Sequence, residues 1–196
     1  MNKNITVIIA SFILALFSSC VGDDNKKEDS ADIYYPVEKV VQAQVDSLKK
    51  SPETWIKTVD ENGKTETKKI IAKDTEWKTE LAILYDLTPN KNAYAGKFKI
   101  DSVTKENQTI ITYQSTDLKL SMLTIIKNND GSLKAIYGDL DNSNLFYHSH
   151  YEISLVPYTA FAISGRQTLA FFNSQELFSI QWVKEKTDSI STANIN

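Results

Sequence analysis

The sequence predicts an α+β protein in which two N-terminal amphipathic helices pack on a curled, mostly antiparallel sheet. Apolar residues recur at helical spacing in two segments between residues 36 and 89, and from residue 94 onward the apolar period changes to two. Short turns separate most of the later segments, and such connections imply antiparallel neighbours. About seven or eight strands would not lie flat, so we expect the sheet to wrap partly around the helices like a half-barrel.

The first helix is expected to begin near Pro36 and to end at Lys49-Lys50. Proline suits the first turn of a helix, and the two lysines favour its negative C-terminal end. One narrow apolar stripe runs along this segment, so the helix should cover another element. The stripe consists of Val37, Val41, Gln44, Val45 and Leu48.

A second helix is expected after residue 74. Asp74 or Thr75 can cap its first turn, and Thr88-Pro89 should end it, because a residue before proline avoids helical angles. Its predicted buried stripe consists of Trp77, Leu81, Leu84 and Tyr85.

Strands are predicted on both sides of this helix. Residues 55–60 and 65–71 flank Asn62-Gly63, a pair that permits the positive φ angles of a tight hairpin. The apolar alternation then begins at Tyr94 and continues to residue 101. The remaining expected strands are residues 109–114, 118–127, 133–137, 145–155, 160–164, 168–172 and 177–183, with turns at Asn129-Asp130-Gly131 and Gly165-Arg166.

The first nineteen residues resemble a bacterial lipoprotein signal peptide. A lysine-bearing start leads into a thirteen-residue apolar segment from Ile5 to Phe17, shorter than the ~20 residues that a membrane span needs. The sequence Phe17-Ser18-Ser19 directly precedes Cys20, the only cysteine. This pattern resembles the lipobox, which implies that Cys20 carries acyl chains such as palmitate and becomes the first residue of the mature protein. The alternative is a lone small residue at the end of an ordinary secretory signal.

The expected organisation is a signal peptide at residues 1–19, a lipidated cysteine and flexible tether at 20–31, a single α+β domain at 32–184 and a disordered tail at 185–196. Residues 21–31 are charged and small, so they cannot bury enough apolar surface to offset the entropy of ordering. Asp23-Asp24 resembles the export signals of outer-membrane lipoproteins in Bacteroidota, which implies a surface-exposed location in the cell envelope.

Charge and composition exclude several partners and cofactors. Without the signal peptide, 21 lysines and arginines face 25 aspartates and glutamates, a formal charge of −4 with no basic cluster, so no nucleic-acid binding is expected. Six widely spaced glycines form neither a phosphate-binding loop nor a dinucleotide motif, and no cofactor is predicted. With Cys20 acylated, no thiol remains for a disulfide.

His148 and His150 are the only histidines, and their spacing places them on one face of the strand expected at residues 145–155. Glu152 continues that face, but four strand residues span ~13 Å, too far for one ion to reach both His148 and Glu152. The opposite, core-facing side is expected to carry Leu145, Tyr147, Tyr151 and Ile153. The histidines should therefore face solvent, and a metal site would need a ligand from elsewhere in the chain.

From Asp139 onward, oxygen side chains occupy alternate positions, as at the start of a calcium loop. An EF-hand loop needs glycine at its sixth position and glutamate at its twelfth, where this chain has Asn144 and His150. We therefore interpret the segment as a polar turn between two strands. Asp139 or Asp141 could still supply a carboxylate to an adventitious ion near His148.

Four Asp-Ser-aliphatic triplets resemble the O-glycosylation motif of Bacteroidota. Their serines are Ser30, Ser47, Ser102 and Ser189. Ser30 and Ser189 lie in segments expected to be flexible and are the accessible candidates.

A set of short motifs resembles those of uncharacterised Bacteroidota outer-membrane lipoproteins. The motifs are Trp77-Lys78-x-Glu80-Leu81, Asp86-Leu87-x-x-Asn90-Lys91, Leu118-Lys119-Leu120, Asn144-Leu145-x-Tyr147-x-Ser149 and Ala162-Ile163-Ser164-Gly165-Arg166-Gln167. They cover most of the expected domain. The resemblance implies a lipid-anchored envelope protein with one domain, and it brings no activity with it.

The function we favour from the sequence is that of a non-enzymatic envelope lipoprotein that binds or assembles with an envelope protein or glycan. The first alternative is a carrier of an apolar ligand in a half-barrel cavity, and the second is a metal-assisted hydrolase that uses His148 and His150. Helices that fill the concave face would favour binding, an open apolar cavity a carrier, and a third ligand beside the histidines a metal site. The carrier's face would consist of Phe98, Tyr147, Tyr151, Phe161, Phe172, Phe178 and Trp182.

Overall fold

The computed structural model describes residues 33–169 and 174–186. Contacts divide the chain into Met1–Ile33 and Tyr34–Asn196, and the fold below is that of the second unit. Cys20, the tether, the tail beyond residue 186 and the glycosylation candidates Ser30 and Ser189 lie outside the described residues.

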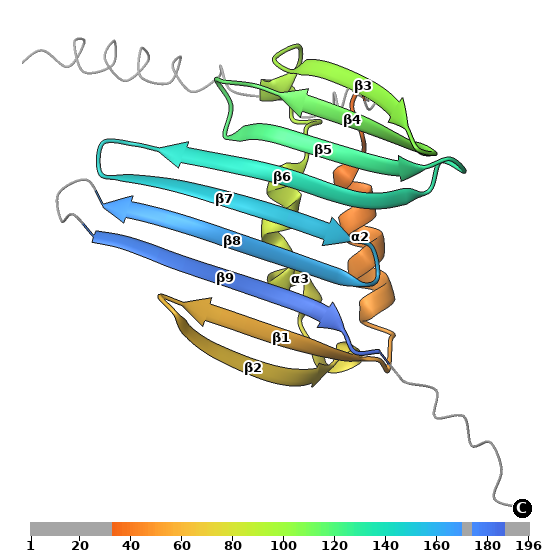
Figure 1. Ribbon diagram of the computed structural model, residues 1–196, viewed down its shortest axis with the longest axis vertical. Helices are drawn as coiled ribbons and strands as arrows, with labels where there is room; N and C mark the ends of the chain where they lie inside the picture. Colours follow the sequence, from red (N-terminus) through yellow and green to blue (C-terminus); the bar gives the residue numbers. More distant parts are fainter. Residues whose placement is uncertain (1–32, 170–173, 187–196) are drawn as a thin grey trace, which may run out of the picture. The chain divides into compact units, whose positions relative to one another are not determined.

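Nine strands of the described residues form one sheet in the order β2-β1-β9-β8-β7-β6-β5-β4-β3 (Figure 1). All neighbours are antiparallel, which confirms the predicted mostly antiparallel sheet, and the sheet is open, with β2 and β3 at its edges. The strands are β1 (Thr54–Glu61), β2 (Lys64–Ile71), β3 (Lys99–Lys105), β4 (Gln108–Gln114), β5 (Leu120–Asn128), β6 (Leu133–Ser143), β7 (Tyr147–Val156), β8 (Ala160–Leu169) and β9 (Ser174–Lys184).

The predicted N-terminal hairpin is present and belongs to the main sheet. β1 pairs with β2 on one side and with β9 on the other. Asn62 and Gly63 have φ angles of 51° and 83°, the left-handed values that a two-residue hairpin turn requires. The strand count therefore exceeds seven or eight, because the hairpin extends the sheet beyond β9.

Helical segments cover one face of the sheet, and Figure 1 shows them behind the strands. The segments are α2 (Val37–Leu48), η1 (Ala72–Asp74), α3 (Trp77–Glu80), η2 (Ala82–Leu87) and η3 (Asn92–Tyr94). The stripe predicted for the first helix is the buried side of α2. The segment after residue 76 is α-helical for four residues and then becomes a 3₁₀ helix. With three residues per turn, Leu81, Leu84 and Leu87 share its buried side, and Tyr85 is only half-buried.

The three tryptophans lie together between the helical layer and the sheet. Trp77 of α3 has its ring centroid 5.5 Å from that of Trp55 on β1 and 4.9 Å from that of Trp182 on β9. Its indole nitrogen donates a 2.7 Å hydrogen bond to the carbonyl of Ala72, and all three side chains are buried. This cluster joins the N-terminal hairpin, the short helix and the C-terminal strand into one core.

Two predicted turns are wrong in position. The chain runs straight through Gly165-Arg166 inside β8, where Gly165 pairs with Tyr151 of β7 and with Phe178 of β9. A Cβ at Gly165 would come within 2.5 Å of the Phe178 ring, so glycine serves here for close approach. Asp139 also lies inside a strand, β6, and not in a polar turn.

The strand expected from residue 145 also begins later than predicted. β7 starts at Tyr147, and Leu145 lies in the β6–β7 turn with 76% of its surface exposed, so it does not belong to the core. Tyr94 ends a 3₁₀ turn rather than starting a strand, and the strand predicted there begins at Lys99.

Candidate functional site

The sheet face opposite the helices is uncovered by any described residue, and we call it the open face. The strand registers arrange its side chains in rows that cross β5 to β9. One row is Met122, Asp139, Glu152, Ser164 and Ser179, and the next is Thr124, Tyr137, Ser154, Ala162 and Gln181. A third, apolar row contains Ile110, Ile126 and Ala135 on β4 to β6 and Val156, Ala160, Val183 and Ile56 on β7, β8, β9 and β1.

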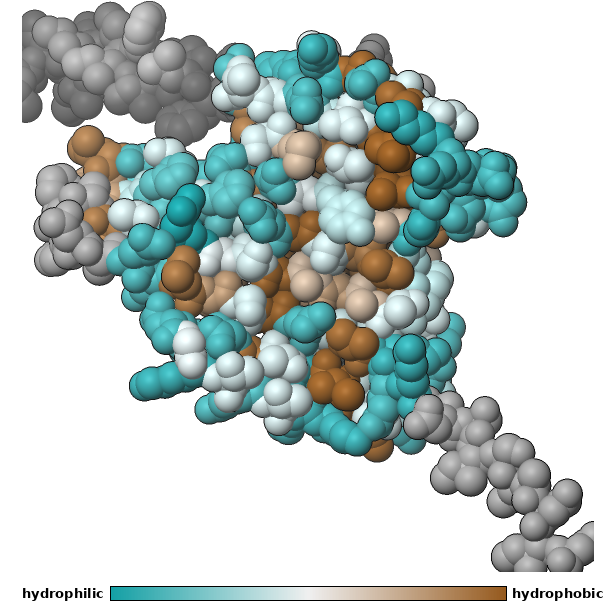
Figure 2. Space-filling model, in the orientation of Figure 1, coloured by the Kyte–Doolittle hydropathy of each residue, from teal (hydrophilic) through white to brown (hydrophobic). Residues whose placement is uncertain are grey.

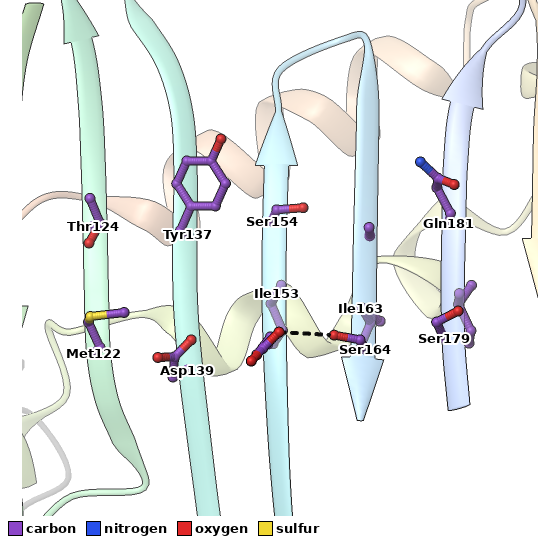
Figure 3. A pocket seen from close by; sticks show the side chains of 13 residues that line it. Met122, Thr124, Tyr137, Asp139, Ile153, Ser154, Ile163, Ser164, Ser179 and Gln181 are labelled. Carbon is purple, nitrogen blue, oxygen red and sulfur yellow. Dashed lines mark hydrogen bonds between the residues drawn. The ribbon is translucent and has the colours of Figure 1, made fainter. Parts of the chain in front are cut away.

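The first two rows form a hollow of about 550 Å³ (Figure 3). Its middle is lined by the short side chains of Ser154, Ala162 and Ser164, which leave space that larger side chains would fill. Tyr137 stands beside it with 43% of its surface exposed, and Gln181 borders the other side. Figure 2 shows this face, with pale and hydrophobic residues across its middle and hydrophilic residues along much of its margin.

A polar cluster borders this hollow at Asp139 and Glu152. The Nδ1 atom of His150 lies 2.8 Å from Oδ1 of Asp141, its partner across the β6–β7 pair. Ser121 donates a 2.6 Å hydrogen bond to Oδ2 of Asp141, and Nε2 of His150 lies 3.8 Å from Oε1 of Glu152. Three neighbouring strands are therefore joined by side chains on their open face.

The charged groups in this cluster shift one another's pKa values. The hydrogen bond to Asp141 raises the pKa of His150 above 6.5, although burial opposes the shift. Burial raises the pKa of Asp141, but the hydrogen bonds from Ser121 and His150 outweigh it, so the pKa is lowered. Burial raises the pKa of Asp139, and the nearby carboxylates of Glu152 and Asp141 add to that shift against the effect of His150. The arrangement favours a positively charged His150 held between carboxylates.

This geometry has the form of a structural ion pair. In a nucleophilic triad the histidine nitrogen opposite the carboxylate accepts a hydrogen bond from the nucleophile, but here that nitrogen faces Glu152. The Ser121 hydroxyl donates its hydrogen bond to Asp141 and not to His150. Ser149 points to the other face, as strand alternation predicts, where it is buried and donates to the carbonyl of Asn142 at 3.4 Å.

The candidate metal ligands come together only in part. Asp139, Asp141 and His150 are neighbours on the open face, whereas His148 lies further along β7, opposite Ser143, and is exposed. Within residues 33–169 and 174–186, no group of three or more histidine, cysteine, aspartate or glutamate side chains is arranged to hold a metal ion. The sequence predicted that both histidines face solvent. His150 is instead half-buried and paired, because a register unknown from the sequence sets Asp141 beside it.

The aromatic face considered for an apolar ligand is the face that the helices cover. Phe161 and Trp182 are buried in the core, and Tyr151 packs on Phe178. Phe98 packs edge-on against Tyr34. Tyr147 lies at the end of this face, where its hydroxyl accepts a hydrogen bond from Asn142, and Phe172 lies outside the described residues.

No helix among the described residues is long and apolar enough to cross a membrane.

Comparisons with protein-family models, with curated proteins and with solved structures find no match to this chain. The observations define the protein by its architecture: an open antiparallel sheet with helices on one face and a hollow on the other.

Proposed function

We propose that the chain is a membrane-anchored lipoprotein of the cell envelope whose domain is a non-enzymatic binding or assembly module. The lipid on Cys20 would hold it at the outer membrane, and Asp23-Asp24 would direct it to the outer surface. The lipobox pattern and the resemblance to Bacteroidota lipoproteins support this part of the proposal. Partial wrapping of the sheet around two N-terminal helices, as in a half-barrel, belongs to the same proposal.

The observation that carries the binding role is the difference between the two sheet faces. The helices and the tryptophan cluster fill one face, while the open face keeps a hollow of about 550 Å³ next to an apolar row. On this face Tyr137 and Val156 are exposed and most of the apolar row is half-buried. Contiguous apolar surface rimmed by polar side chains is typical of interaction surfaces. We infer that an envelope protein or glycan docks on the open face across β5 to β9.

The test is to fill the hollow without disturbing the core. Ala162→Trp places a large ring among the short side chains, and Thr67→Trp places the same ring on the exposed edge strand β2 as a matched control. The immobilised full chain should retain a defined protein or glycan from an envelope extract, and Ala162→Trp should lose that retention while Thr67→Trp keeps it. Equal retention by both variants, with both folded by circular dichroism, would contradict docking in the hollow.

The same preparation separates the two alternative functions. A stoichiometric acyl ligand found by mass spectrometry would favour the carrier. One zinc per chain, lost after His148→Ala with His150→Ala, would favour the metal-assisted hydrolase. The binding module predicts neither.

A further inference from the structure

A second hollow of about 530 Å³ lies on the open face at the β3 edge, and it shares Met122 with the first. The two lysines that line it, Lys97 and Lys99, are two residues apart. Lys99 is the first residue of β3 and Lys97 precedes the strand, so both lysines line the hollow at the start of the edge strand. The other lining residues are Gln114, Ser115, Thr116, Asp117 and Ser121.

The two lysines are available for a ligand. Neither forms an ion pair with a described carboxylate, whereas the nearby Lys91 and Lys119 both pair with Asp86. Two ammonium groups at the same hollow repel each other, and an anion between them would remove that repulsion. With the carboxylate of Asp117 in the same lining, the hollow keeps one positive charge in excess.

The neutral side chains supply further donors. The Ser115 hydroxyl oxygen accepts the backbone N–H of Asp117 at 3.3 Å, which leaves its own proton free to donate. Gln114 is exposed and has no hydrogen bond to a described side chain, so its amide can donate as well. The single carboxylate, that of Asp117, already accepts from Thr116.

We propose that this hollow binds a phosphate group. Two ammonium groups, a hydroxyl and an amide match the several acceptor oxygens of one phosphate, and lysine is a common point-charge ligand for it. The group can belong to free phosphate or to a phospholipid head.

The test uses the full chain in a non-ionic detergent and isothermal titration calorimetry. The probes are inorganic phosphate and dihexanoyl phosphatidic acid, with dihexanoyl phosphatidylcholine as the lipid control. Lys97→Gln with Lys99→Gln should weaken binding by about tenfold or more, because two charge-assisted hydrogen bonds are lost. Arginine at both positions should retain binding. The matched control is Lys64→Gln with Lys68→Gln on the exposed edge strand β2.

The outcomes distinguish the two sources. Binding of both phosphate and phosphatidic acid identifies a site for the free anion, and binding of phosphatidic acid alone identifies a lipid headgroup site. Either result supports the proposal if the substitutions at Lys97 and Lys99 weaken binding and those at Lys64 and Lys68 do not. Absence of binding by both probes, equal loss in the β2 control, or no loss in either pair would overturn it.

Discussion

The Nδ1 atom of His150 on β7 lies 2.8 Å from the Oδ1 atom of Asp141 on β6. The two residues face each other in the antiparallel register, and Ser121 on β5 holds the other carboxylate oxygen. This contact makes the stability of the sheet depend on the protonation of one imidazole, since the attraction needs a charged His150.

We expect the free energy of unfolding to decrease as the pH rises from 6.5 through the raised pKa of His150 in the folded protein. The folded pKa of His150 is raised above 6.5, chiefly by its hydrogen bond to Asp141. A group with a raised folded pKa stabilises the protein fully below its unfolded pKa, and this contribution is lost as the pH rises through the folded value. The change should be about 0.5–1 kcal/mol, because the pair is partly exposed.

Urea unfolding at a series of pH values measures this effect. Asp141→Asn should flatten the dependence above pH 6 and lower the pKa of His150 measured by NMR. Glu176→Gln, which neutralises an exposed carboxylate on β9, is the control and should leave the dependence in place. An unchanged slope in Asp141→Asn would show that the ion pair does not cause it.

Gly138→Ala should destabilise the domain by about 1–3 kcal/mol through overpacking. A Cβ at Gly138 on β6 would lie 2.4 Å from Cδ2 of Leu87, which is fully buried in η2. Chemical denaturation of Gly138→Ala, Leu87→Ala and the double variant tests the cause. If the clash is responsible, the double variant should cost less than the sum of the single variants. If the changes in the free energy of unfolding are additive, the contact with Leu87 is not the cause of the destabilisation.

Trp77→Ala should be among the most destabilising single substitutions, at about 3–5 kcal/mol, because it leaves a cavity between Trp55 and Trp182. Trp77→Phe should cost less, since a ring still fills part of the site. Tyr137→Ala removes an aromatic ring from the open face and serves as the control, with a change within about 0.5 kcal/mol. Similar losses for Trp77→Ala and Tyr137→Ala in urea unfolding would contradict the location of the core.

Local patterns in the sequence were sufficient for the features that depend on neighbours along the chain. The α2 stripe from Val37 to Leu48 follows helical period, and Asn62-Gly63 carries the conformational preference of its hairpin turn. Gly165 shows the limit of such patterns. Its presence favours a turn locally, but Phe178 packs against it from another strand, and that contact is invisible in the sequence.

The candidate site could not be predicted from the sequence, because strand register decides which of its residues lie side by side. His150 and Asp141 could be recognised as polar candidates, yet their pairing is set by the β6–β7 alignment. Ser121 reaches Asp141 from β5, next to a register shift between Leu120 and Met122 that no local signal marks. The short side chains of Ser154 and Ala162 are visible in the sequence, but they form a hollow only because the two strands pair and bring them side by side.

Cys20→Ser should abolish incorporation of radiolabelled palmitate and release the protein from membranes or leave its precursor uncut. The expectation rests on the position of Cys20 directly after the apolar segment and two serines, where lipoprotein signal peptides are processed. Labelling in intact cells followed by membrane fractionation measures both effects. Ser47→Cys in the Cys20→Ser background supplies a cysteine on the exposed side of α2 and should not restore the label, because acylation requires the processed N-terminus. Label that persists in Cys20→Ser would remove the basis for a lipid anchor, and label restored by Ser47→Cys would show that the modification is not specific to the lipobox.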